Sequence, residues 1–120
     1  MTGPVATGAA AGFSAAWIWL VAAGLLEIGW AIGLKETNGF TRVWPTILTV
    51  VGMILSFVCL AQAVRSLPIG TAYAVWTGIG TIGAAAIGMM VYREPATAPR
   101  IACITLIILG IIGLKLTAPR

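Results

Sequence analysis

The chain has 120 residues, of which 60% are hydrophobic and only 8% are charged, whereas about a quarter of the residues in an ordinary soluble domain carry a charge. A soluble chain this short buries too little of its surface to hide so much apolar area, so the composition excludes a water-soluble domain and indicates a single membrane domain. The net charge of +4 comes from Lys and Arg residues scattered singly at the ends of apolar runs. That pattern is typical of membrane anchors and excludes a nucleic-acid surface.

Residues 1–16 are rich in Ala, Gly and Thr and contain no charged side chain. A secretory signal peptide begins with a basic region, which is missing from this segment. We therefore expect residues 1–16 to form a flexible N-terminal tail and residues 17–120 to form a four-helix transmembrane domain.

Four apolar segments follow this tail, and each would be about 27 to 33 Å long as a helix, which matches the hydrocarbon core of a bilayer. Helices are required because lipid cannot bond to free backbone groups. The predicted helices cover residues 17–34, 45–64, 71–92 and 99–116. Short connections predict that consecutive helices are antiparallel neighbours. The sequence thus predicts an all-α membrane protein with four transmembrane helices per protomer.

The basic residues give almost no orientation signal. One side of the membrane would hold Arg65, Lys115 and Arg120, and the other Lys35, Arg42, Arg93 and Arg100. Such a balance lets the chain insert in either sense. Four helices are also few to enclose a pathway, and two oppositely inserted copies would supply the inverted repeat that many transporters use. Both points indicate an antiparallel homodimer.

Glu27 is the only acidic residue inside a predicted span. An ionised, unpaired carboxylate at that depth costs several kcal/mol, so intramembrane acids are functional by default. Such a carboxyl can hold a proton or pair with a cation but not both favourably, which is the physical basis of antiport. The alternative is a structural glutamate paired with a basic residue, for which Lys115 is the best candidate.

Residues at helical spacing from this carboxyl, or on the facing spans, suggest a cation site. Gly24 leaves room on the same helix face and Trp30 offers a ring one turn away. Ser56 is expected either to hydrogen-bond the carboxylate or to bond its own helix backbone. Tyr73 and Trp76 share one face of the third span, where aromatic rings attract desolvated cations by up to about 2 kcal/mol. Alternatively, Trp30 and Trp76 are only large side chains that fill space in the packing or face lipid.

The segment from Gly78 to Gly83 fits the G-x-G-x-x-G pattern. It lies inside an apolar span with no preceding strand, so dinucleotide binding is rejected. We expect Gly78 and Gly80 to form a hinge in the third helix. Close helix packing without a hinge is the alternative.

The two cysteines, Cys59 and Cys103, lie in apolar stretches, and the chain has no histidine. This pattern does not support a zinc site, and we expect no metal and no cofactor. No nucleophile, base and orienting group cluster in the sequence, so we do not expect an enzyme.

Several segments together are similar to a known family. They are Ala23 to Ala31, Lys35, Asn38 to Arg42, Trp44-Pro45, Leu67 to Gly80, and Glu94-Pro95. On these segments the chain, from Trp17 onward, resembles the small multidrug resistance transporters. Gly24, Glu27 and Trp30 resemble the guanidinium-exporter subtype of that family.

The resemblance implies an antiparallel homodimer of dual topology in the bacterial plasma (inner) membrane, with one site shared by two copies of Glu27. It implies that Ser56, Tyr73 and Trp76 belong to the site and that Gly78 to Gly80 form a kink. It also implies dimer contacts on the fourth helix, where Lys115 would be an accessory residue.

The leading hypothesis is a proton-coupled antiporter that exports guanidinium and small guanidinyl cations. The chemistry agrees, because planar guanidinium presents paired N–H donors to a carboxylate fork and stacks on aromatic rings. The expected partners are this cation or another small organic cation, protons, the lipid bilayer and a second copy of the chain. The alternatives are a broad-specificity quaternary ammonium or multidrug exporter, a cation channel, and a structural subunit without transport.

Overall fold

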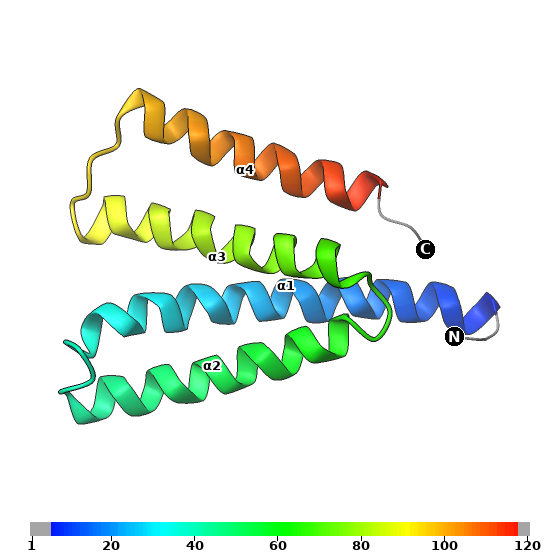
Figure 1. The fold of residues 1–120 in the computed structure, drawn as a ribbon, viewed down its shortest axis with the longest axis horizontal. Helices are drawn as coiled ribbons and strands as arrows, with labels where there is room; N and C mark the ends of the chain where they lie inside the picture. The colour runs from blue at the N-terminus through cyan, green and yellow to red at the C-terminus, as the bar shows by residue number, and fades with distance from the viewer. Residues whose placement is uncertain (1–5, 118–120) are drawn as a thin grey trace.

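The computed structural model describes residues 6–117, with side chains from Ser14 onward. The described residues form four helices, α1 (Ala6–Glu36), α2 (Val43–Ala63), α3 (Ile69–Val91) and α4 (Ala98–Thr117) (Figure 1). Residues Ser14–Glu36 of α1 and the whole of the other three helices are long and apolar enough to cross a membrane. The prediction of an all-helical chain with four candidate membrane spans is confirmed.

The first helix begins earlier than the sequence suggested. It starts at Ala6, whereas the predicted start was Trp17. The segment between them is dominated by alanine, the strongest helix former, and contains no proline. The expected tail of residues 1–16 therefore overlaps α1 from Ala6 onward, and residues 1–5 lie outside the described residues. The other three helices begin and end within two residues of their predicted bounds.

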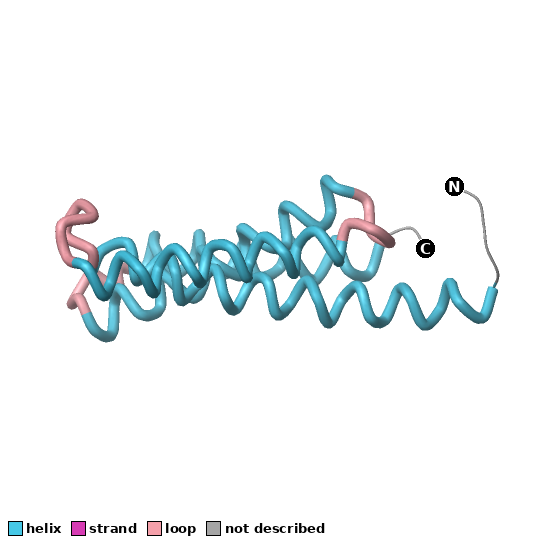
Figure 2. The backbone as a smooth tube through the Cα atoms, turned by 90° about the horizontal axis from the view of Figure 1, so that it is seen from below, coloured by secondary structure: helices cyan, strands magenta, loops and turns pink. Residues whose placement is uncertain are grey.

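The four helices lie in a thin layer. The chain measures 49 × 37 × 17 Å, and its smallest dimension is roughly one and a half times the diameter of one helix, about 10–12 Å. Figure 1 shows the order α4, α3, α1, α2 across this layer, and Figure 2 shows the layer from below. The α1–α2 and α3–α4 connections lie at one end, and the α2–α3 connection lies at the other. We call the end that holds the α1–α2 and α3–α4 connections the two-loop end.

Helix α1 packs closely against both α2 and α3, whereas the backbone of α4 approaches only that of α3. The expectation that all consecutive helices are close neighbours is wrong for α2 and α3, which approach each other at few positions. The reason is that α1 lies between α2 and α3 in the layer and packs against both. The rings of Phe57 and Trp76 still meet, with centroids 5.7 Å apart.

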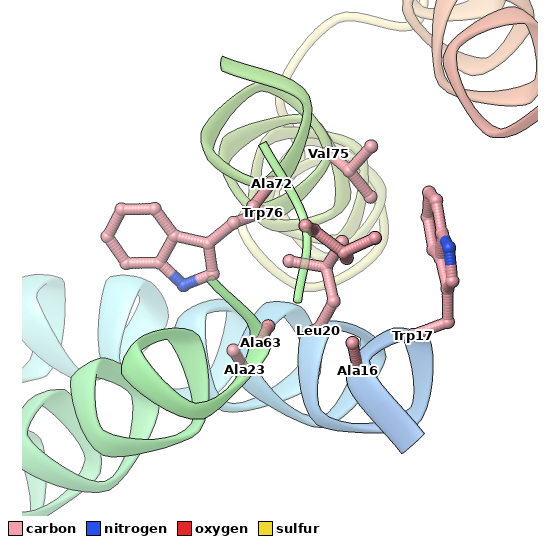
Figure 3. Close-up of a cluster of buried hydrophobic side chains, with 9 residues drawn as sticks. Ala16, Trp17, Leu20, Ala23, Ala63, Ala72, Val75 and Trp76 are labelled. Carbon is pink, nitrogen blue, oxygen red and sulfur yellow. The ribbon is translucent and has the colours of Figure 1, made fainter. Parts of the chain in front are cut away.

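Small side chains let α1, α2 and α3 approach one another near the α2–α3 connection. The buried apolar cluster there consists of Ala16, Trp17, Leu20, Ala23, Ala63, Leu67, Ala72, Val75 and Trp76 (Figure 3). Trp17 and Trp76 lie on opposite sides of this cluster. No described residue of α4 is buried, and α2 and α4 expose many large apolar side chains, as helices facing lipid or a partner do.

Candidate functional site

Glu27 lies near the middle of the membrane-spanning part of α1, and its side chain is partly buried against α3. A Cβ atom added to Gly80 would lie 2.5 Å from Glu27 Cδ and 2.6 Å from Oε1. Non-bonded atoms normally remain about 3.5–4.0 Å apart. Glycine at position 80 is therefore what leaves space for the carboxylate.

Gly24 allows the same close approach one turn earlier on α1. A Cβ atom at Gly24 would lie 2.7 Å from the Cβ of Ile79. Position 24 is buried in the contact between α1 and α3, so in this chain the glycine sets how closely the two helices pack beside Glu27.

A hydrogen-bonded chain joins three helices next to this carboxylate. The indole Nε1 of Trp76 donates to Ser56 Oγ at 3.0 Å, and Ser56 Oγ donates to the carbonyl oxygen of Ala23 at 2.7 Å. Ser56 is fully buried. The two bonding partners expected for Ser56, Glu27 and its own helix backbone, are both wrong, because the small side chain of Ala23 brings the α1 backbone within reach of the hydroxyl. The bonds tie the Trp76 indole, through Ser56, to the α1 backbone at Ala23, one turn before Glu27.

Four aromatic rings continue this arrangement from α1 through α2 to α3. The rings of Trp30 and Phe57 lie 6.3 Å apart, those of Phe57 and Trp76 5.7 Å, and those of Trp76 and Tyr73 5.3 Å. These centroid separations fall in the range of attractive aromatic pairs. The structure thus brings together three predicted site residues and adds Phe57, which the sequence analysis missed. A single phenylalanine in an apolar span is ordinary lipid-facing sequence, so no local signal identifies it.

Two polar atoms at this site have no hydrogen-bond partner within residues 6–117. They are Oε1 of Glu27 and Nε1 of Trp30, and both are buried from solvent in the chain. Residues three positions apart share one face of a helix. A carboxylate oxygen without a partner, one helical turn from the Trp30 ring, is suited to bind a small cation that carries N–H donors.

The sequence profile described as "Small Multidrug Resistance protein" matches residues 15–107. The chain belongs to this family. It is 58% identical over 101 residues to a guanidinium exporter of Escherichia coli K12, an alignment that covers 84% of this chain and 96% of the relative. Guanidinium exporters of Citrobacter freundii and Salmonella typhimurium are 56% identical over 101 residues, with the same coverage. The resemblance noted from sequence is confirmed, and family membership favours a transporter over an enzyme.

Lys115 of this small multidrug resistance protein lies away from Glu27. Its Nζ is 5.1 Å from the ring centroid of Trp17, and Trp17 precedes Glu27 by ten residues, or about 15 Å along the helix. Among the described residues, ion pairs join Arg42 to Glu36 and Arg100 to Glu94 only. The fixed Glu27–Lys115 pair left open from the sequence is therefore not formed within this chain.

Gly78 and Gly80 lie in the uninterrupted helix α3 and face different neighbours. A Cβ at Gly78 would lie 2.7 Å from Ile111 Cδ1 on α4, whereas one at Gly80 would overlap Glu27 on α1. Close helix packing thus explains why glycine occupies both positions. A hinge at these glycines is a separate proposal, because it concerns the motion of α3.

Proposed function

We propose that this small multidrug resistance protein exports guanidinium and small guanidinyl cations across the bacterial plasma membrane in exchange for protons. The observation that carries the proposal is the Glu27 carboxylate, which lies at mid-span without a hydrogen-bond or ion-pair partner among residues 6–117. The guanidinium exporters to which the chain is 56–58% identical support the substrate.

In the proposed cycle, Glu27 binds either a proton or the cation. Guanidinium is planar, and two of its N–H groups match the two oxygens of a carboxylate. The rings of Trp30 and Trp76 supply faces that attract the cation once water is excluded. Tyr73, whose ring is 53% exposed in the single chain, extends this lining. Because a proton and a cation compete for the same carboxylate, Glu27 carries the cation across the membrane in one direction and a proton in the other.

We propose that two oppositely inserted copies form the working unit, with both Glu27 carboxylates in one shared site. Three features support this arrangement. The chain is only 17 Å thick, α4 buries none of its described residues, and the basic residues are balanced between the two ends. Two nearby acids titrate as a coupled pair, so the two carboxylates would share protons and cation.

A hinge at Gly78 and Gly80 would let the two halves of α3 move relative to each other during this cycle. Glycine in a helix interior lowers the cost of bending. The position of Gly80 against Glu27 would then connect the bend directly to occupancy of the site.

The test is guanidinium transport by the purified protein in liposomes, with proton flux recorded at the same time. We expect Glu27→Gln to abolish proton-coupled transport, because the amide neither releases a proton nor pairs with the cation. The matched control is Glu94→Gln, which replaces an acid in the α3–α4 connection and should retain transport. Full coupling in Glu27→Gln would refute the mechanism, and a cation current without counter-moving protons would indicate a channel.

The second candidate is export of bulkier quaternary ammonium cations, and the four-ring aromatic lining favours it because ring faces attract such ions. The same liposomes distinguish the two functions. Transport of guanidinium without transport of a bulky hydrophobic cation supports the first proposal, and the opposite result supports the second.

A further inference from the structure

A cluster of polar contacts at the two-loop end ties the end of α1 to the end of α3. The hydroxyl of Tyr92 donates to Oε2 of Glu36, and Lys35 Nζ lies 5.2 Å from the centre of the Tyr92 ring. Arg42 holds the other side of Glu36, with Nη1 3.6 Å from Oε1 and 3.0 Å from the Glu36 carbonyl oxygen. We call these four residues the end clasp.

The turn that follows α1 fixes Glu36 for this contact. Thr37 is 1% exposed, and its Oγ1 donates to the carbonyl oxygen of Leu34 at 2.7 Å and accepts from the backbone N–H of Phe40 at 3.1 Å. The residue directly after Glu36 is thus held in place from both sides. The turn therefore fixes the backbone from which the half-exposed Glu36 side chain reaches Tyr92.

The electrostatics of the clasp agree with a formed contact. The hydrogen bond to Glu36, with smaller effects of desolvation and of the carboxylate charge, raises the pKa of Tyr92 above its ordinary value. Tyr92 follows the last residue of the α3 span, Val91. At physiological pH the phenol is therefore neutral and remains the donor.

The clasp differs from the other ion pair at the same end. Arg100 and Glu94 lie 3.4 Å apart, and both belong to the α3–α4 region. That pair can persist when α1 and α3 separate. The Glu36–Tyr92 contact cannot, because its two residues are 56 positions apart and end two different helices.

Helix geometry makes the clasp sensitive to a small bend at the glycines. Tyr92 lies twelve residues beyond Gly80, which is about 18 Å of helix. A bend of about 10° at Gly80 therefore moves the α3 end by about 3 Å, which is enough to break a hydrogen bond, since these extend only over about 2.5–3.0 Å for O–H donors.

We propose that the Glu36–Tyr92 contact is a gating contact that holds the two-loop end of α1 and α3 closed and must break for the transporter to change access. The inference rests on the proposed function, because a gate has meaning only if the chain transports. In an antiparallel pair, the two-loop ends of the two copies face opposite sides of the membrane. One copy would therefore hold its clasp closed while the other opens.

The first test is a double-mutant cycle on transport rate. Tyr92→Phe removes the hydroxyl and keeps the ring under Lys35, and Glu36→Gln removes the charge at nearly constant size. Each is expected to change maximal guanidinium turnover about 3- to 10-fold, the effect of losing one hydrogen bond, with less than a twofold change in KM. The effect of the double variant should be smaller than the product of the two single effects, because both substitutions act on the same Glu36–Tyr92 contact. The gate would be overturned if the effect of the double variant equalled the product of the two single effects, or if the single variants left the turnover rate unchanged.

Glu94→Gln is the matched control, since it breaks the neighbouring ion pair without separating α1 from α3, and its turnover should stay within twofold of the parent. An equal change in Glu94→Gln would mean that loss of charge at this end, and not the clasp, affects the rate.

The second test locks the clasp. Glu36→Cys and Tyr92→Cys are combined with Cys59→Ala and Cys103→Ala, and a reversible thiol cross-linker of matching length joins positions 36 and 92. Cross-linking should stop turnover while guanidinium still quenches tryptophan fluorescence, and reductant should restore transport. Undiminished transport in the linked protein overturns the gate and leaves the exporter function intact. Absence of guanidinium transport in the unmodified protein instead refutes the proposed function on which the gate rests.

Discussion

Replacing Gly80 by alanine tests whether the space beside Glu27 is what makes the carboxylate functional. The new methyl group would lie 2.5 Å from Glu27 Cδ and 2.8 Å from Cγ, about 1 Å or more inside normal carbon contact distance. The carboxyl group is the flexible end of a long side chain, so it can move away by that amount. A displacement of about 1 Å at a reacting group can reduce rates by about 100-fold.

The effect on stability should be much smaller. Alanine gains about 1 kcal/mol over glycine in a helix interior, and over-packing costs about 1–3 kcal/mol. The free energy of unfolding should therefore fall by about 0–2 kcal/mol. The expected result is a folded protein of nearly normal thermal stability whose guanidinium turnover is lower by about 10- to 100-fold.

The assay compares guanidinium uptake and thermal unfolding for Gly80→Ala and Gly29→Ala. Gly29 is the matched control, because it lies on α1 two residues from Glu27 and a Cβ there meets nothing within 4 Å. Normal turnover in Gly80→Ala would refute the reasoning, and so would equal losses in both variants.

Two further predictions concern the polar contacts. Ser56→Ala leaves Trp76 Nε1 without its acceptor, so we expect the free energy of unfolding to fall by about 1–3 kcal/mol and guanidinium binding, measured by calorimetry, to weaken. Ser56→Thr keeps the hydroxyl and should recover most of the binding. Equal binding by the two variants would count against the hydrogen bond. The Tyr92 pKa is raised by Glu36, so the contact is present at neutral pH, is kept up to the ordinary tyrosine pKa of about 10, and is lost as the pH rises through the raised value. In a Tyr73→Phe background, which leaves one tyrosine of the two, ultraviolet titration should show Glu36→Gln lowering the Tyr92 pKa, and an unchanged pKa would contradict the contact.

The number and type of helices were predictable because lipid leaves few choices. A membrane span must satisfy its own backbone and be about 20 residues long, so apolar runs between turn residues were enough. Glu27 was equally visible, since one acid inside four apolar spans needs no structural information to be noticed. The start of α1 at Ala6 was missed because alanine and glycine mark neither a helix nor a tail clearly.

The side-chain contacts were not predictable in the same way. The partner of Ser56 depends on how α2 is rotated against α1, and a serine can reach several acceptors within one turn. The separation of α2 from α3 depends on α1 lying between them, an arrangement that no local pattern reveals. The Glu36–Tyr92 contact joins an exposed and a half-buried residue 56 positions apart, so it appears only once the helices are assembled.

The unburied fourth helix makes dilution in lipid an informative variable. No described residue of α4 is buried within the chain, and its backbone approaches only that of α3, so much of its surface is left to pack against the molecules around it. If a second copy is that neighbour, mass action makes association depend on the protein-to-lipid ratio. Specific activity should then fall as vesicles are prepared with fewer copies each, and the ratio at half activity would measure how strongly two such thin chains hold together in a bilayer.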